Sequence, residues 1–253
     1  MITRQEAVLR ELNLYPLWQR RNERATSPSV VPLSESEALV TKVEVKIIPP
    51  LKTIAPPGVP AYPGIPEYKV EDWSTLKGVV EGCTACKLRA GCTQPVFGVG
   101  EEKADWVFVG EGPGDEEDSL GQPFVGEAGK LLDNMLSAMK LNRSKNVFIS
   151  HVVKCRPPEN RTPEADEIAT CIPYLQRQIA LIQPKIIVAL GKTAATSLLG
   201  YDDSLSSLRK KLHDYHGIPL VVTFDPAYLL RTPLEKAGAW QDLCLALEAI
   251  GPN

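Results

Sequence analysis

The stretch Trp106-Val-Phe-Val-Gly-Glu-Gly-Pro-Gly-Asp115 decides the fold. Its first four residues form a short apolar run that ends at Gly110, which predicts a buried strand. The glycines that follow let the backbone pass close to a ligand, and Pro113 stiffens the turn. In an open parallel sheet, ligands bind beyond the carboxyl ends of the strands. We therefore expect a binding site directly after this strand.

Strands and helices alternate along the rest of the chain. The expected elements are, in order, a helix over Glu127–Lys140, a strand over Asn146–Val153, a helix over Pro163–Ile182, a strand over Lys185–Leu190, a helix from Lys192, a strand over Ile218–Phe224 and a helix over Leu234–Ile250. This order predicts an α/β fold, a three-layer αβα arrangement with a central parallel sheet covered on both faces.

Composition divides the 253 residues into three zones. Residues 1–24 have the charge and apolar pattern of an amphipathic helix, which either packs on the main domain or binds another protein. Residues 25–71 contain nine prolines between Pro28 and Pro66, which predicts a disordered linker. Residues 72–253 have the pattern of one globular domain, and we expect a monomer.

The chain shows no pattern of a secreted or membrane protein. Its N-terminus lacks an uninterrupted apolar segment, and its apolar runs are too short to cross a bilayer. We expect a cytoplasmic protein with no membrane partner. Thiols stay reduced there, so the six cysteines favour metal binding or buried thiols over disulfides.

Four of the cysteines have the spacing of a metal site. Cys83 and Cys86 form a C-x2-C pair, and Cys155 and Cys171 follow with 15 residues between them. Spacing alone leaves structural zinc, an iron–sulfur cluster and simple buried thiols as alternatives. Cys92 is a candidate fifth thiol near this site.

An acidic segment, Asp115–Asp118, follows the glycine turn. Four adjacent acids would repel one another on a helix, so we expect a loop or a helix entry that holds carboxylates near a cleft. Phe124 lies six residues further on. Its ring could stack on a flat ligand or pack in the core.

Together these segments resemble the iron–sulfur, family 4 uracil-DNA glycosylases over about residues 80–248. The matching segments are C-x2-C at 83–86, FGVG at 97–100, GEGPGDEED at 110–118, GQPFVGEAGKLL at 121–132, VVKCRPPENRTP at 152–163 with Cys171, and DPAYLLRTP at 225–233. The resemblance implies a uracil-DNA glycosylase-like fold with a [4Fe–4S] cluster on Cys83, Cys86, Cys155 and Cys171. It also implies excision of uracil from single- or double-stranded DNA, the first step of base excision repair.

The resemblance assigns a base pocket. Gly110, Glu111 and Gly112 match the loop that lines the base and sugar, and Glu111 is also a catalytic candidate. Phe124 matches the ring that stacks on uracil. His151 occupies the position that reads the edge of the base.

Further positions correspond to catalysis and DNA contact. Glu117 matches a carboxylate near the reaction centre, suited to placing water or stabilising a cationic sugar. Asp225 occupies the position of a hydrogen-bond donor to uracil O2. Leu229 and Leu230 match apolar residues that enter the duplex, and Arg231 matches a phosphate contact.

Local basic residues are needed for DNA binding, since the net charge is −3. Lys154, Arg156 and Arg161 near the cysteines, together with Arg209-Lys210-Lys211, are the candidates from the sequence.

Two pocket positions differ from the family pattern. The family has Asn where this chain has His151, and His where it has Asp225. An ionised Asp225 donates no hydrogen bond and would repel a uracil anion. Three activities follow as alternatives: excision of uracil, excision of another modified base, and DNA or partner binding without turnover.

Overall fold

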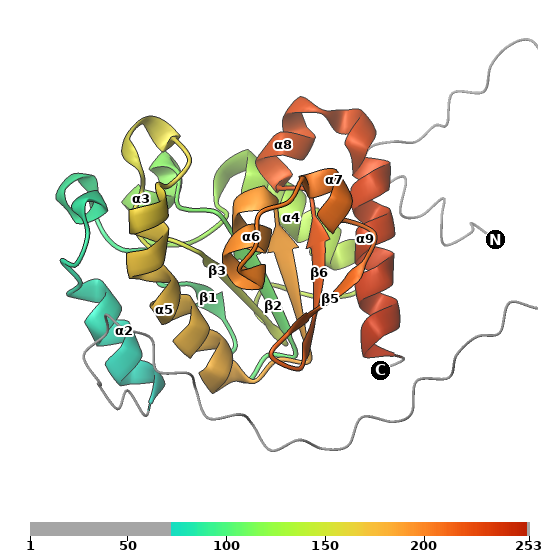
Figure 1. The fold of residues 1–253 in the computed structure, drawn as a ribbon, viewed down its shortest axis with the longest axis horizontal. Helices are drawn as coiled ribbons and strands as arrows, with labels where there is room; N and C mark the ends of the chain where they lie inside the picture. The colour runs from blue at the N-terminus through green and yellow to red at the C-terminus, as the bar shows by residue number, and fades with distance from the viewer. Residues whose placement is uncertain (1–71, 252–253) are drawn as a thin grey trace, which may run out of the picture.

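The computed structural model describes residues 72–251, so the predicted helix over 1–24 and the predicted linker over 25–71 lie outside the described residues. The described part contains a six-stranded sheet with helices on both faces (Figure 1). This arrangement confirms the predicted α/β fold. Within these residues, no helix has the length and apolar character needed to cross a membrane.

The sheet is mixed and mostly parallel. Its strands, in the spatial order β1-β3-β2-β4-β6-β5, are β1 Val99–Gly100, β3 Val147–His151, β2 Trp106–Gly110, β4 Ile186–Leu190, β6 Ile218–Thr223 and β5 Leu212–Tyr215. The four central strands are parallel, as predicted. The edge strands β1 and β5 pair antiparallel with their neighbours, which the sequence pattern did not predict.

Helices connect these strands. The α-helices are α2 Trp73–Glu81, α3 Asp115–Leu120, α4 Gly126–Ala138, α5 Ala165–Ile182, α6 Lys192–Leu199, α7 Leu205–Leu208, α8 Pro226–Arg231 and α9 Lys236–Ile250, and the short 3-10 helices are η1 Lys87–Gly91, η2 Pro158–Asn160 and η3 Pro233–Glu235. Figure 1 shows α5 and α6 on one side of the sheet and α4 and α9 on the other.

The strand β2 illustrates how the core forms. Trp106 and Phe108 point to the layer of α4 and α9, whereas Val107 and Val109 point to the layer of α5 and α6. All five residues of β2 are buried. Burial of a large apolar side chain contributes about 1.5–3 kcal/mol, so this central strand anchors both layers.

The acidic segment is the entry of a helix, one of the two predicted alternatives. Asp115–Asp118 occupies the first turn of α3, where the helix dipole favours carboxylates. Glu117 closes a capping arrangement by accepting from the backbone N–H of Gly114 at 2.5 Å. These two effects offset the repulsion between neighbouring acids.

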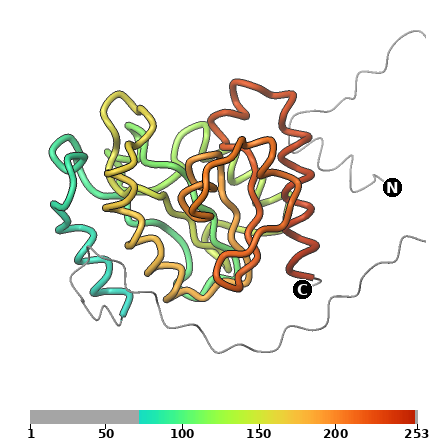
Figure 2. Tube along the Cα trace, viewed as in Figure 1, coloured from blue at the N-terminus to red at the C-terminus, as the bar shows by residue number. Residues whose placement is uncertain are grey.

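The connections create a crevice at one end of the sheet. The chain leaves β2 toward the α4 layer and leaves the neighbouring β4 toward the α6 layer. Adjacent parallel strands with diverging connections define the usual position of a ligand site. Figure 2 shows the loops around residues 90, 120, 160 and 230 gathered at this end.

Candidate active site

A cleft of about 910 Å³ occupies this end of the sheet, and the ends of four parallel strands contribute to it. The predicted site residues that line it are Glu111, Gly112, Glu117, Phe124, His151, Asp225 and Arg231. Residues far apart in the sequence therefore meet in one cleft, as expected from the topology.

The floor of the cleft depends on Gly110. This residue pairs with His151 in the sheet, so the ends of β2 and β3 lie side by side. A Cβ atom on Gly110 would lie 2.6 Å from His151 Nδ1 and 2.5 Å from the Phe124 ring. Only glycine therefore lets these two rings approach, and their centroids lie 4.8 Å apart.

Phe124 is held in an uncommon backbone conformation. Its φ of 52° lies in the left-handed region, which costs free energy for a residue other than glycine. The Phe124 N–H donates to Glu117 Oε1, and its carbonyl accepts from Arg143 Nη2 at 2.8 Å. Arg143 also donates to the carbonyl of Pro123 and to Asp133, so it clamps this loop from behind. No local motif pointed to Arg143.

Glu117, which is partly exposed, lies next to the buried His151. His151 Nε2 lies 3.4 Å from Glu117 Oε1, and the His151 side chain is 2% exposed. Burial opposes ionisation of Glu117, but His151 and the backbone N–H groups of Gly114 and Phe124 outweigh it and lower the pKa of Glu117. Both Glu117 oxygens accept backbone hydrogen bonds, Oε2 from Gly114 and Oε1 from Phe124. The role of Glu117 in placing water stays a prediction.

Asp225 begins helix α8. Its Oδ1 accepts from the N–H of Ala227 at 2.7 Å and from that of Tyr228 at 3.4 Å. Burial raises the pKa of Asp225 and Glu117 adds to this, against the two N–H groups and His151. The carboxyl is therefore easier to protonate than an exposed aspartate.

Gly191 makes room for Asp225. A Cβ atom on Gly191 would lie 3.3 Å from the Asp225 Cβ, at a φ of 95° that favours glycine. On the same strand end, Thr193 Oγ1 donates to Glu111 Oε2 at 2.5 Å. This bond spans the crevice between β2 and β4, and it fixes the carboxylate of Glu111. The sequence did not point to Thr193.

The predicted DNA-contacting residues separate into two groups. Leu229 is 1% exposed and packs in the core beside α4 and α9, which does not favour its entry into a duplex, and that role stays a prediction. Its neighbour Leu230 is 41% exposed, and Arg231 is exposed at the rim of the cleft. Helical geometry explains the difference, since consecutive residues of α8 point in different directions.

Several basic residues expected to attract DNA are engaged elsewhere. Lys154 is 2% exposed, and burial lowers its pKa to about 7 against the Cys171 thiolate. Arg209 is buried on Asp242 at 2.6 Å, and Arg156 pairs with Asp115. Lys210 and Lys211 remain exposed, as predicted.

The structure brings the four predicted ligand cysteines together. Cys155 and Cys171 are buried in the same cluster of the core, and Cys86 packs against it. Cys83 Sγ accepts from Tyr174 Oη at 3.2 Å, and Cys171 Sγ accepts from the Lys154 N–H at the same distance. Hydrogen bonds to sulfur of this kind tune iron–sulfur clusters.

The chemistry of these thiols fits a metal centre. Burial raises the pKa of Cys155 and, to about 11, that of Cys171, and like charge on neighbouring thiolates adds to both shifts. Binding to iron stabilises thiolates that the fold alone disfavours. Within residues 72–251, no three Cys, His, Asp or Glu side chains are arranged for a single ion. A [4Fe–4S] cluster requires a wider arrangement, because its thiolates bind different irons.

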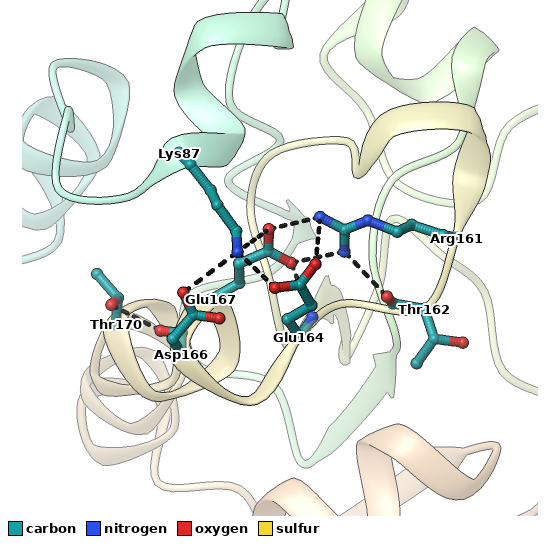
Figure 3. Close-up of polar contacts among 7 residues, drawn as sticks. All are labelled: Lys87, Arg161, Thr162, Glu164, Asp166, Glu167 and Thr170. Carbon is teal, nitrogen blue, oxygen red and sulfur yellow. Dashed lines mark hydrogen bonds and ion pairs between the residues drawn. The ribbon is translucent and has the colours of Figure 1, made fainter.

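An ionic clamp links segments that carry or flank the cysteines in the sequence (Figure 3). Lys87, next to Cys86, pairs with Glu164 at 2.5 Å and with Asp166 at 3.3 Å. Arg161 donates two hydrogen bonds, of 2.8 and 2.7 Å, to the buried Glu167. The clamp joins η1, the loop after β3 and the start of α5, which are the segments that carry or flank the ligand cysteines.

Comparison with known proteins identifies the family of this chain. A family model described as the uracil DNA glycosylase superfamily matches residues 97–244. A type-4 uracil-DNA glycosylase of Thermotoga maritima is 47% identical over 60% of this chain and 80% of its own length. Those of Pyrobaculum aerophilum and Sulfurisphaera tokodaii are 38% and 45% identical, over 69% and 62% of this chain and 92% and 76% of their lengths. The chain therefore belongs to the uracil-DNA glycosylase superfamily and, within it, to the type-4 family.

Proposed function

We propose that this chain hydrolyses the N-glycosidic bond of uracil in DNA and that it carries a [4Fe–4S] cluster. One observation carries the proposal: Phe124, His151 and Asp225 line one cleft at the end of the parallel sheet. The chain belongs to a superfamily that acts on uracil in DNA. The cleft is open to solvent, as entry of a flipped nucleotide requires.

Base recognition would use the rings at the floor of the cleft. Phe124 offers a flat apolar surface for the base, and its fixed backbone keeps that surface in place. His151 Nε2 lies 3.4 Å from Glu117 Oε1, and within the described residues neither ring nitrogen makes a hydrogen bond, so both are available to a base. An imidazole N–H donates a hydrogen bond, which suits a carbonyl oxygen such as uracil O4.

Departure of the base places negative charge on uracil O2. Asp225 serves this charge only as a protonated acid, since a carboxylate would repel it. One oxygen, Oδ1, is committed to two backbone N–H groups, which leaves Oδ2 to carry the proton. The glycosidic bond breaks to leave a uracil anion and a cationic sugar, which Glu111 beside the crevice stabilises. Water then adds to the sugar carbon and releases a proton, which neutralises the uracil anion.

The cluster would serve the fold of this site. When bound to Cys83, Cys86, Cys155 and Cys171, it supplies a covalent link between the loop before η1, the loop after β3 and helix α5. The raised pKa values of the thiols and the hydrogen bonds to their sulfurs support this ligand set. The ionic clamp around Glu167 holds the same segments.

The test is a glycosylase assay on the full chain loaded with iron and sulfide. Single- and double-stranded oligonucleotides with one uracil are incubated and then treated with alkali, and strand cleavage at the uracil is expected. Protein with a full cluster that leaves both substrates intact would overturn the proposal. A colourless protein with stoichiometric zinc would refute the cluster.

The alternative, in which Asp225 accepts a hydrogen bond from an exocyclic amine of the base, is tested with oligonucleotides that carry other modified bases. Faster release of such a base than of uracil would replace the proposed substrate. Activity that arises only in the double variant Asp225→His, His151→Asn would indicate a binding protein without turnover.

A further inference from the structure

Lys154 connects the cysteine centre to the base cleft. It lies directly before Cys155, and its backbone N–H donates to Cys171 Sγ at 3.2 Å. Its side chain runs back along the end of β3, where Nζ donates to the carbonyl of His151 at 2.7 Å. One residue thus contacts a sulfur of the cysteine centre and the backbone of the residue that reads the base.

The ammonium of Lys154 is fully engaged. Besides the His151 carbonyl, Nζ donates to Ser150 Oγ at 2.6 Å and to Gln178 Oε1 at 2.8 Å. Three acceptors match the three N–H donors of an ammonium. Gln178 is in turn fixed by donating from Nε2 to the Phe97 carbonyl at 2.8 Å. This arrangement holds the Lys154 side chain in one position.

All three acceptors are uncharged. A buried cation is costly unless a negative group lies nearby. The thiols near this residue are Cys171, whose sulfur is bonded to the Lys154 backbone, and Cys155, which is adjacent in sequence; a thiolate at Cys171 favours the charged form of Lys154. A cluster with four thiolate ligands is anionic, so it supplies the charge that the ammonium lacks.

We propose that Lys154 is a positioning residue whose buried ammonium balances the charge of the cluster and fixes the backbone of His151 in the base cleft. The inference rests on the proposed function, because it assumes the cluster and the base-reading role of His151. It explains why a lysine stands in the core, where DNA cannot reach it. It also predicts that a change at the cluster is felt at His151.

The test compares Lys154→Met with the parent protein, both loaded with iron and sulfide. A cation stabilises the reduced, more negative cluster, so its removal lowers the reduction potential measured by spectroelectrochemistry. The second readout is nuclear magnetic resonance of the imidazoles, which follows the titration of His151. The chain has three histidines, and His213 and His216 serve as internal references.

We expect a lower potential and a shifted titration of His151, with the other two histidines unchanged. A potential equal to that of the parent, or an unmoved His151, would overturn the proposal. The exposed residue Lys103 provides the control variant Lys103→Met, which should change neither readout.

A second variant guards against misfolding. Lys154→Met leaves buried acceptors without donors, which destabilises the core. The double variant Lys154→Met, Gln178→Met also removes one of those acceptors, and the same two shifts are expected from it. The parent's glycosylase assay and iron content are measured first, so a failure of the proposed function is seen separately from a failure of the role of Lys154.

Discussion

Replacement of Asp225 by asparagine tests how this site manages without the family's histidine. The change is nearly isosteric, and the amide oxygen can still accept from the Ala227 N–H, 2.7 Å from Oδ1 in the parent. Asparagine caps helices about as well as aspartate, so the stability of α8 should change by less than about 0.5 kcal/mol. The amide nitrogen then replaces Oδ2 and donates a hydrogen bond at every pH.

The expected effect grows with pH. In the parent, Asp225 donates only when protonated, and its pKa is raised by burial. The parent's rate should therefore fall as pH rises through that raised pKa. One donor to a developing anion contributes about 10²–10³ in rate. At a pH where the carboxyl is ionised, Asp225→Asn should thus exceed the parent by up to about 10²-fold.

The assay is single-turnover excision of uracil from a single-stranded oligonucleotide between pH 5 and pH 9. The informative quantity is the rate of Asp225→Asn divided by that of the parent, because Glu117 and His151 are the same in both proteins. Other charged groups that face the cleft, Glu111, Asp115, Glu116, Glu127, Lys192 and Arg231, are also common to both. A ratio that stays flat or falls as pH rises would refute a protonated Asp225 as the donor. Asp225→Ala is the control, because it loses the cap and the donor together.

Three further predictions concern residues that support or flank the site. Arg143→Met should raise KM for uracil-containing DNA about tenfold in steady-state assays, because the Phe124 loop loses its clamp; an unchanged KM would contradict the clamp. Leu230→Ala should slow excision from duplex DNA by about tenfold more than from single strands, since an exposed wedge is needed only to open a duplex; equal losses would argue against a wedge. The pKa of Glu167 is lowered to about 2, chiefly by Arg161, so its contribution to stability is complete above about pH 4.5 and is lost as pH falls toward 2. Urea unfolding between pH 2 and 5 should show this loss in the parent and a smaller one in Glu167→Gln, and equal slopes would count against it.

The sequence predicted the elements whose pattern is local. The buried run of β2 and the helical periodicity of α4, α5 and α9 were identified to within a few residues. The edge strand β1 has only two residues and forms through its pairing with β3, so no periodic pattern marks it. The helix α8 was not among the predicted elements, although Asp225 and Pro226 are a standard start for a helix.

In the candidate site, too, residues in local motifs were predicted and residues that act through distant contacts were not. Motif resemblance identified Phe124, His151 and Asp225, and the fold brings them into one cleft. The supporting residues Arg143 and Thr193 could not be found in this way, because their roles depend on contacts between distant segments. The exposure of individual side chains on α8 also could not be predicted from the sequence. The adjacent residues Leu229 and Leu230 have the same side chain, and only the packing of α8 distinguishes a core residue from an exposed one.

The two departures from the family pattern acquire a common physical basis in this cleft. At position 151 the family's asparagine amide is replaced by the imidazole of His151. At position 225 the family's histidine is replaced by the carboxyl of Asp225. A ring nitrogen of His151 donates a hydrogen bond when it carries a proton, and burial favours the neutral form of Asp225, whose carboxyl O–H also donates. With these protonation states, both positions present hydrogen-bond donors. A site built this way binds uracil carbonyls well only while Asp225 keeps its proton, and the pH dependence of Asp225→Asn relative to the parent measures that condition directly.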